Sequence, residues 1–137
     1  MSIVYVCDED RPEGHNNYRE NKKIVTINTN AALTPTHVCD ARQCHTWFVD
    51  TSIAVLRFAY CPWSVYTSLE KWLPKVRIGG MVEFFGPTYD TLMPVGGTVR
   101  DTQTFKRTLV NAIRTSHTKF NKVLNNTQPY VVLVRLA

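Results

Sequence analysis

Side chains that bind metals or act as nucleophiles occur close together in one stretch, as His37, Cys39, Cys44 and His45. Thiolate and imidazole groups are the usual protein ligands of zinc. The spacing of these four residues does not match the paired spacings of zinc fingers, so buried thiols and surface histidines are the favoured interpretation, and no metal site is predicted. Cys61 with a histidine partner could act as a nucleophile, but the sequence identifies no neighbour that would activate its thiol.

Three polar side chains stand at the ends of apolar, β-rich runs, and each could bind a ligand. Asp8 follows the first run, Asn28 closes the second and Asp40 follows the third. An Asp in such a position commonly caps the turn that follows, and its carboxylate can equally accept hydrogen bonds from a ligand. Asn28, or Asn30 two residues later, offers an amide that can bond a hydroxyl group but lacks the charge that makes such bonds strong.

Apolar runs predict the elements that would position these side chains. Strands are expected at residues 2–7, 23–28, 36–39, 48–59 and 81–85. A helix over 62–76 is predicted before the last strand, because its apolar residues recur at the 3.6-residue spacing of one helical face. Pro62 suits its first turn, and Gly79 or Gly80 can supply the left-handed residue that ends it. The strands on either side of this helix are therefore expected to run parallel, joined by a right-handed crossover.

The rest of the chain is expected to hold two loops, one more helix and a hairpin. Residues 11–22 have almost no apolar face, and residues 86–99 contain two Pro and three Gly, so both are predicted loops, the second a candidate lid or partner-binding loop. A helix is predicted to begin at Asp101 or one residue later. The runs 119–124 and 130–136, joined by a turn with Asn and Pro, predict a β-hairpin.

Length and composition indicate one globular unit. At 137 residues, a single domain over residues 1–137 is expected, which can bury about two thirds of its unfolded surface. No apolar run is long enough to cross a membrane and no signal segment is present, so a soluble protein of the cytoplasm is expected. The four cysteines lie in or beside predicted strands, which indicates reduced, mostly buried thiols.

Basic residues are in excess, and several gather in the C-terminal part. The net charge is +5 and the pI about 9.2. This balance favours an acidic partner such as a nucleic acid or an acidic protein surface, although surplus Lys and Arg is also a route to solubility. Five basic residues lie on or just after the last predicted helix: Lys106, Arg107, Arg114, Lys119 and Lys122. They could contact phosphates, or they could form the solvated face of an amphipathic helix.

The order of these motifs resembles the second half of a class I S-adenosylmethionine-dependent methyltransferase. The similarity lies in Asp40-Ala41 after a strand, the strand TSIAVL, a helix that ends in LPKVRIGG, and the strand MVEFFGP. The resemblance implies an α/β fold with three Rossmann-like layers, a mostly parallel sheet and a C-terminal antiparallel hairpin. A compact version of such a fold would suit a viral or mobile-element protein.

The resemblance also implies roles for single residues. In that family the acidic residue at the position of Asp40 receives the adenine amino group of S-adenosylmethionine, and Asp8 and Asn28 would complete the cofactor pocket. The fourth strand ends in the stretch YCPW, which begins at Tyr60. Trp63 of this stretch would stack on a flat substrate base; the alternative is that it packs beside the helix that follows.

The sequence departs from the family pattern at the centre of the cofactor site. A glycine-rich turn normally follows the first strand, because glycines let the backbone approach the cofactor closely. Gly14 is the only glycine in the corresponding stretch. The second strand ends in Asn28 where the family has an acid, and Tyr60 stands where amino-methylating members carry Asp or Asn.

These departures favour a non-catalytic function. We expect a methyltransferase-like domain with a degenerate cofactor site that acts as a binding or inhibitory module for a protein or nucleic-acid partner. The alternative is a minimal methyltransferase that binds S-adenosylmethionine. An incomplete helical layer would leave part of the sheet exposed, and this face could support a homo-oligomer.

Overall fold

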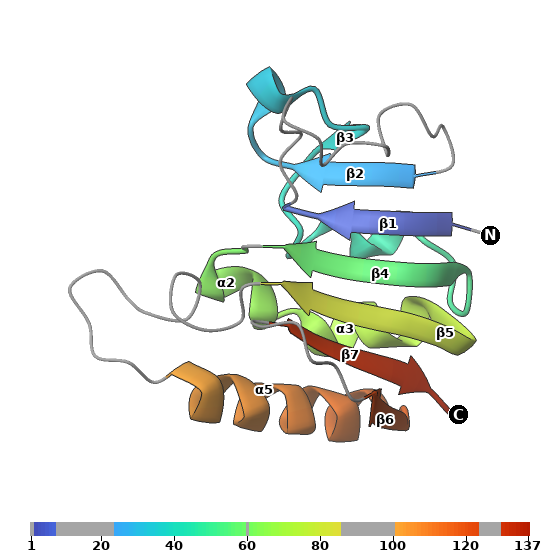
Figure 1. The fold of residues 1–137 in the computed structure, drawn as a ribbon. Coiled ribbons are helices and arrows are strands. Elements are labelled where there is room, and N and C mark those ends of the chain that lie inside the picture. Colours follow the sequence, from blue (N-terminus) through green and yellow to red (C-terminus); the bar gives the residue numbers. More distant parts are fainter. Residues whose placement is uncertain (1, 8–23, 60, 86–100, 124–129) are drawn as a thin grey trace.

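A seven-stranded mixed sheet forms the centre of the computed structural model, which describes residues 2–7, 24–59, 61–85, 101–123 and 130–137 (Figure 1). The strands are β1 (Ser2–Val6), β2 (Ile24–Asn28), β3 (His37–Val38), β4 (Ile53–Ala59), β5 (Val76–Phe85), β6 (Phe120–Val123) and β7 (Tyr130–Arg135). Their order across the sheet is β3-β2-β1-β4-β5-β7-β6. The first five run parallel, and β7 is antiparallel to both β5 and β6. The structure confirms the expected Rossmann-like α/β fold, mostly parallel with a C-terminal antiparallel hairpin.

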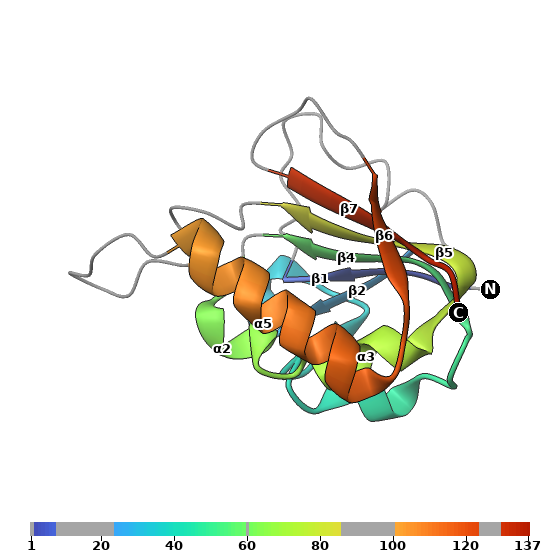
Figure 2. The same ribbon diagram turned by 90° about the horizontal axis from the view of Figure 1, so that it is seen from below.

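The helices that the structure describes lie together on one face of this sheet (Figure 2). They are α2 (Trp63–Tyr66), α3 (Leu69–Trp72) and α5 (Asp101–Ser116), with the 3-10 turns η2 (Cys44–Trp47) and η3 (Leu73–Lys75). Strand alternation directs Phe58 and Phe84 toward these helices, and their rings stack at 5.4 Å between centroids. Phe105 of α5 meets Phe84 edge-on at 5.1 Å. The core therefore lies between the sheet and this helical layer.

The opposite face of the sheet is polar at its centre. Arg57 of β4 lies in register with Glu83 of β5, and its Nε donates to Glu83 Oε2 at 3.2 Å. The Arg57 guanidinium also lies 3.9 Å from the ring centroid of Tyr5 and 4.7 Å from that of Phe85. These contacts offset part of the cost of removing the two charges from water. A second helical layer over this face is not among the described residues.

The helix predicted from Pro62 onward is divided into α2, α3 and η3, which corrects the expectation of one continuous helix. The hydroxyl groups of Thr67 and Ser68 each donate to the carbonyl oxygen three residues earlier, at 2.6 and 2.7 Å. Such bonds compete with the backbone pattern of a helix, and Pro74 lacks the N–H that a longer helix would need. The predicted apolar face is nevertheless buried: Val65, Leu69, Trp72, Leu73 and Val76.

Gly79 and Gly80 lie inside β5 rather than at the end of a helix, which corrects their predicted role. The helical segment ends at Lys75, and β5 begins at the next residue. The pairing of β5 with β4 shifts register here, as at a bulge. Gly79 has a φ of +84°, which favours glycine, and a Cβ on Gly80 would lie 2.9 Å from the carbonyl oxygen of Ala54. The bulge therefore depends on both glycines.

Other element boundaries agree with the sequence prediction in part. β3 has only two residues, and β4 begins at Ile53 rather than at residue 48, because η2 and a turn precede it. A 3-10 turn, η1 (Ala31–Leu33), precedes β3 and is capped by Asn30. α5 begins at Asp101, as predicted. The two predicted loops lie outside the described residues.

Among the described segments, no helix is both long and apolar enough to cross a bilayer.

Candidate functional site

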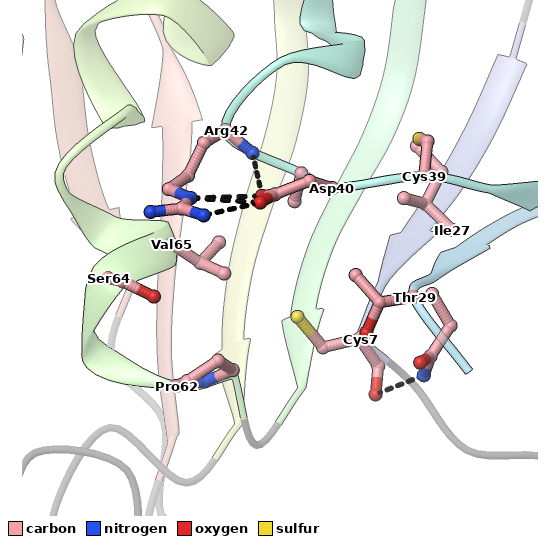
Figure 3. Close-up of a pocket in the computed structure, with 11 residues that line it drawn as sticks. Cys7, Ile27, Thr29, Cys39, Asp40, Arg42, Pro62, Ser64 and Val65 are labelled. Carbon is pink, nitrogen blue, oxygen red and sulfur yellow. Dashed lines mark hydrogen bonds and ion pairs between the residues drawn. The ribbon is translucent and has the colours of Figure 1, made fainter.

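A hollow of about 340 Å³ opens at the carboxyl ends of the parallel strands (Figure 3). Its walls come from residues at or just after the ends of β1 to β4: Cys7, Ile27, Asn28, Thr29, Cys39, Asp40, Ala41, Arg42, Pro62, Ser64 and Val65. In open α/β sheets, ligands bind at this edge, where the strand order reverses. The order reverses between β1 and β4, so the hollow lies where this fold places a ligand.

Asp40 lines the hollow as predicted, but its carboxylate is already bonded to Arg42. The backbone N of Arg42 donates to Oδ1 at 2.9 Å, Nε donates to both oxygens at 3.1 and 3.0 Å, and Nη2 donates to Oδ2 at 2.6 Å. An ionised carboxylate offers about four acceptor positions, and each oxygen of Asp40 faces two donors, with the single Nε–H shared between the two oxygens. Hydrogen bonds from the Arg42 side chain and backbone hold the pKa of Asp40 below its usual range. Asp40 is therefore an ionised group whose acceptor positions are taken.

The loop that carries this ion pair is fixed from the helical layer. The indole Nε1 of Trp72 donates to the backbone carbonyl of Ala41 at 2.7 Å, and this bond is buried. The backbone N of Gln43 donates to the carbonyl of Asp40 at 2.9 Å. Trp72 is itself fully buried in the core. Its bond to Ala41 therefore anchors the backbone between the two residues of the ion pair.

Asn28 also reaches the hollow, and its amide is used by the protein. Its Oδ1 accepts from the backbone N of Asn30 at 2.9 Å, and its Nδ2 donates to the carbonyl of Cys7 at 3.4 Å. These bonds connect the end of β2 to the end of β1. The amide thus has a structural role in addition to any ligand contact. Asp8, the third predicted cofactor-binding residue, lies outside the described residues.

Two disulfides flank the hollow, which corrects the expectation of reduced thiols. Cys7 is bonded to Cys61 with Cα atoms 5.3 Å apart, and Cys39 is bonded to Cys44 with Cα atoms 6.4 Å apart. β1 and β4 are neighbours in the sheet, so their ends bring together two cysteines that are 54 residues apart in sequence. The second bond closes the loop that carries the ion pair. Cys61 is therefore not a free nucleophile.

Trp63 packs against the core and does not line the hollow. It is half-buried at the start of α2, where its ring centroid lies 6.0 Å from that of Tyr66. This position supports packing rather than stacking on a substrate base. Tyr60, the other weak candidate at the end of β4, lies outside the described residues.

His37 and His45, the two histidines near Cys39 and Cys44 in the sequence, each pack on an aromatic ring. His37 meets Trp47 edge-on at 4.8 Å, and His45 meets Trp72 at 6.1 Å. Burial, with the positive charge of Lys75 as a second cause, lowers the pKa of His45. Within the described ranges, no group of three or more His, Cys, Asp or Glu side chains is arranged to hold a metal ion.

The basic residues predicted for partner binding are only partly brought together. Three of them line a second hollow, of about 270 Å³, on the outer surface of α5: Lys106, Arg107 and Arg114. Lys122 lies opposite Leu133 in the pairing of β6 with β7. Leu133 faces the helical layer, so Lys122 shares that side of the sheet. Lys119 is exposed but does not line this hollow.

Sequence reasoning missed the residue that decides the chemistry of the first hollow. Arg42 stands two positions after Asp40, and this close spacing is the signal that could have indicated a local ion pair. Ser64 and Thr29 also line the hollow and were not predicted. Figure 3 shows Asp40 and Arg42 facing each other on the loop after β3.

Solved methyltransferases share this fold. The chain matches a putative methyltransferase from Thermoplasma acidophilum with a TM-score of 0.59 and 11% identity, over 100% of this chain and 69% of that one. An rRNA methylase from Streptococcus thermophilus matches with a TM-score of 0.56 and 13% identity, over 100% and 88%. The 16S rRNA N2 G1207 methyltransferase of T. thermophilus, in complex with AdoMet and guanosine, matches with a TM-score of 0.54 and 11% identity, over 99% and 35%.

These likenesses establish the fold of the chain. No family model and no curated protein sequence matches it. The chain spans only 35% of the T. thermophilus enzyme and 62% of a Corynebacterium glutamicum protein with a TM-score of 0.56. The chain has a class I methyltransferase-like, Rossmann-like fold.

Proposed function

We propose that this methyltransferase-like domain is a non-catalytic binding or inhibitory module for a protein or nucleic-acid partner. The observation that carries this proposal is the bonding of Asp40 by Arg42, which fills both carboxylate oxygens. A residue that receives an adenine amino group needs a free acceptor, whereas both oxygens of Asp40 are already engaged by Arg42. The domain would then retain the fold of its structural neighbours without their cofactor chemistry.

Other residues of the first hollow also fit S-adenosylmethionine poorly. The described residues that line it include no glycine, so this part of the wall offers the cofactor no stretch of backbone without side chains. The amide of Asn28 bonds to neighbouring backbone. The disulfide between Cys7 and Cys61 joins the carboxyl ends of the paired strands β1 and β4, at the edge where the fold places a ligand. In this arrangement the residues of the first hollow therefore do not fit S-adenosylmethionine.

The proposal of a macromolecular partner draws on charge and on the structural neighbours. The exposed cations of α5 supply a surface that an acidic partner can contact. Two of the neighbours are named as enzymes that act on ribosomal RNA. Because the identity to them is low, their names support nucleic acid only as one class of partner to test.

The second candidate is a minimal S-adenosylmethionine-dependent methyltransferase. It is favoured by the place of the first hollow and by its volume of about 340 Å³, which lies within the usual range of ligand pockets of roughly 300–1,000 Å³. Asp40 and Asn28, with Asp8, would hold the cofactor once Arg42 released the carboxylate. The cofactor would supply an electrophilic methyl group, and the protein would position the acceptor.

Calorimetric titration separates the two candidates. S-adenosylmethionine and S-adenosylhomocysteine are titrated into the wild-type protein and into Asp40→Ala, with Asp50→Ala as the matched control. Asp50 is an exposed carboxylate paired with Lys75 at 2.9 Å, and it does not line the hollow. The proposal predicts no heat from either ligand at millimolar concentration. Micromolar binding that weakens in Asp40→Ala but not in Asp50→Ala would overturn it in favour of the enzyme.

A further inference from the structure

The outer surface of α5 carries several cations. We define the basic surface as Lys106, Arg107 and Arg114, together with Lys122 on β6. All four side chains are exposed. Figure 2 shows α5 along the outside of the helical layer, with β6 beside its C-terminal half. The basic surface therefore faces away from the core and from the first hollow.

Helical spacing places the three α5 cations on one side of the helix. At 3.6 residues per turn, Lys106, Arg107 and Arg114 fall within an arc of about 100° around the helix, and the first and last are about 12 Å apart along its axis. The apolar residues Phe105, Leu109 and Ala112 are buried on the other side of the helix. These cations are too far apart to contact one small anion together, so they suit a partner that carries several negative charges.

The cations of the basic surface lack acidic partners in the described part of the chain, whereas several other cations have them. Arg42, Arg57 and Lys75 each pair with a carboxylate. On α5, Arg114 Nη2 donates to the neutral Asn111 Oδ1 at 2.8 Å.

The sequence shows the same asymmetry. Residues 101–137 contain six of the 16 Lys and Arg residues but one of the 11 acidic residues, so this segment accounts for the whole net charge of +5. A positive charge confined to one segment provides a directional electrostatic attraction.

The uncharged residues of this surface help to identify the partner. Val110, at 66% exposure, and Asn111 line the second hollow with the cations, and no aromatic residue does so among the described ones. Surfaces that bind single strands commonly stack bases on aromatic rings. A double helix instead presents a dense array of phosphates, about one charge per 1.7 Å of its axis. A patch of cations without aromatic residues is better matched to the second kind of ligand.

We propose that the basic surface on α5 and β6 binds the phosphate backbone of a double-helical nucleic acid, without reading its sequence. This inference rests on the proposed function and specifies its partner. Contacts to phosphates fix a protein on a duplex but carry no sequence information. The interaction needs no ligand in the first hollow.

The test is duplex binding measured by fluorescence anisotropy over a range of salt concentrations. The probes are a short RNA duplex, a DNA duplex, one single strand and an acidic peptide, and no S-adenosylmethionine is added. Arg107→Gln with Arg114→Gln removes two cations of the basic surface. Lys71→Gln with Arg77→Gln is the matched control, because both residues are exposed and lie outside the basic surface. Circular dichroism checks that each variant is folded.

The inference predicts that a duplex binds with a log–log salt slope of about −3, as expected for three to four phosphate contacts. The α5 variant should bind roughly tenfold more weakly at low salt, with a slope smaller by about 2, and the control should match the wild type. Absence of duplex binding, equal losses in both variants, or tighter binding of the single strand or the peptide would overturn it. None of these outcomes bears on cofactor binding, which the calorimetric titration tests separately.

Discussion

Arg42 holds the carboxylate of Asp40 through its own backbone and side chain, with Nη2 and Oδ2 only 2.6 Å apart. The carboxylate of Asp40 is thus half of a local ion pair. The side chain of Arg42 is 53% exposed, so a substitution there removes the ion pair without disturbing the core.

Arg42→Ala should create adenosine affinity that the wild-type protein lacks. Without the Arg42 side chain, the carboxylate can accept a hydrogen bond from the adenine amino group. Because the ion pair is solvent-exposed, we expect a gain of roughly a few-fold in adenosine binding, measured by ligand-observed NMR. Lys75→Ala serves as the control, because it breaks the ion pair with Asp50 at a distance from the hollow. If adenosine binds the Arg42 variant no better than the control, Arg42 is not what closes the site.

The two disulfides should stabilise the fold unequally. Cys7 and Cys61 are 54 residues apart in sequence, whereas Cys39 and Cys44 are five apart. In the chain-entropy model, closure of the longer loop contributes about 4 kcal/mol and of the shorter about 2 kcal/mol. Urea unfolding of the two double Cys→Ala variants should show this order. A count of four free thiols in the unreduced, denatured protein would show that the pairs do not form.

Substitution of the glycines in the β5 bulge should be costly for two different reasons. Gly80→Ala would place a Cβ 2.9 Å from the carbonyl oxygens of Ala54 and Arg77, and such overpacking typically costs about 1–3 kcal/mol. Gly79→Ala meets no atom within 4 Å but must keep a φ of +84°, at a cost of about 1–2 kcal/mol. Denaturant midpoints test both, and a neutral Gly80→Ala would contradict the bulge.

His45 should make the fold less stable in mild acid. Burial lowers its pKa, as does the nearby charge of Lys75, so the folded protein keeps a neutral imidazole while the unfolded chain binds a proton. The free energy of unfolding should therefore fall as the pH drops below the ordinary value of 6.5 and stop falling at the lowered value. His45→Asn should flatten this part of the pH profile. Equal profiles for the wild type and His45→Asn would exclude this cause.

The sheet and the helical layer were accessible from the sequence because they follow apolar patterning. The spacing of Leu69 and Trp72 predicted the buried helical face correctly, and the run before Ala59 predicted a central strand. The breaks in the helix were not predicted. They coincide with side-chain hydrogen bonds of Thr67 and Ser68 to the backbone, which apolar spacing does not reveal. The Gly79-Gly80 pair was assigned to a turn because a bulge depends on register with a neighbouring strand.

The candidate site could be placed from the sequence, but its state could not. Asp40 and Asn28 were predicted at the strand ends where the hollow lies, because parallel strands deliver their ends to one edge. The pairing of Cys7 with Cys61 depends on which strands are neighbours, and composition alone favoured free thiols. The bond between Arg42 and Asp40 depends on the local backbone of the loop, which no periodic pattern describes.

The central claim is that Arg42 keeps the acceptor positions of Asp40 filled even when cofactor is present. Nitrogen-15 NMR of the Arg42 Nε–H group tests this directly, with Arg42→Lys used to assign the signal. We predict that the Nε–H signal does not shift when S-adenosylmethionine is added to millimolar concentration, because the ion pair with Asp40 persists. A shift that saturates at micromolar cofactor would contradict the claim and show that the pair opens to admit S-adenosylmethionine.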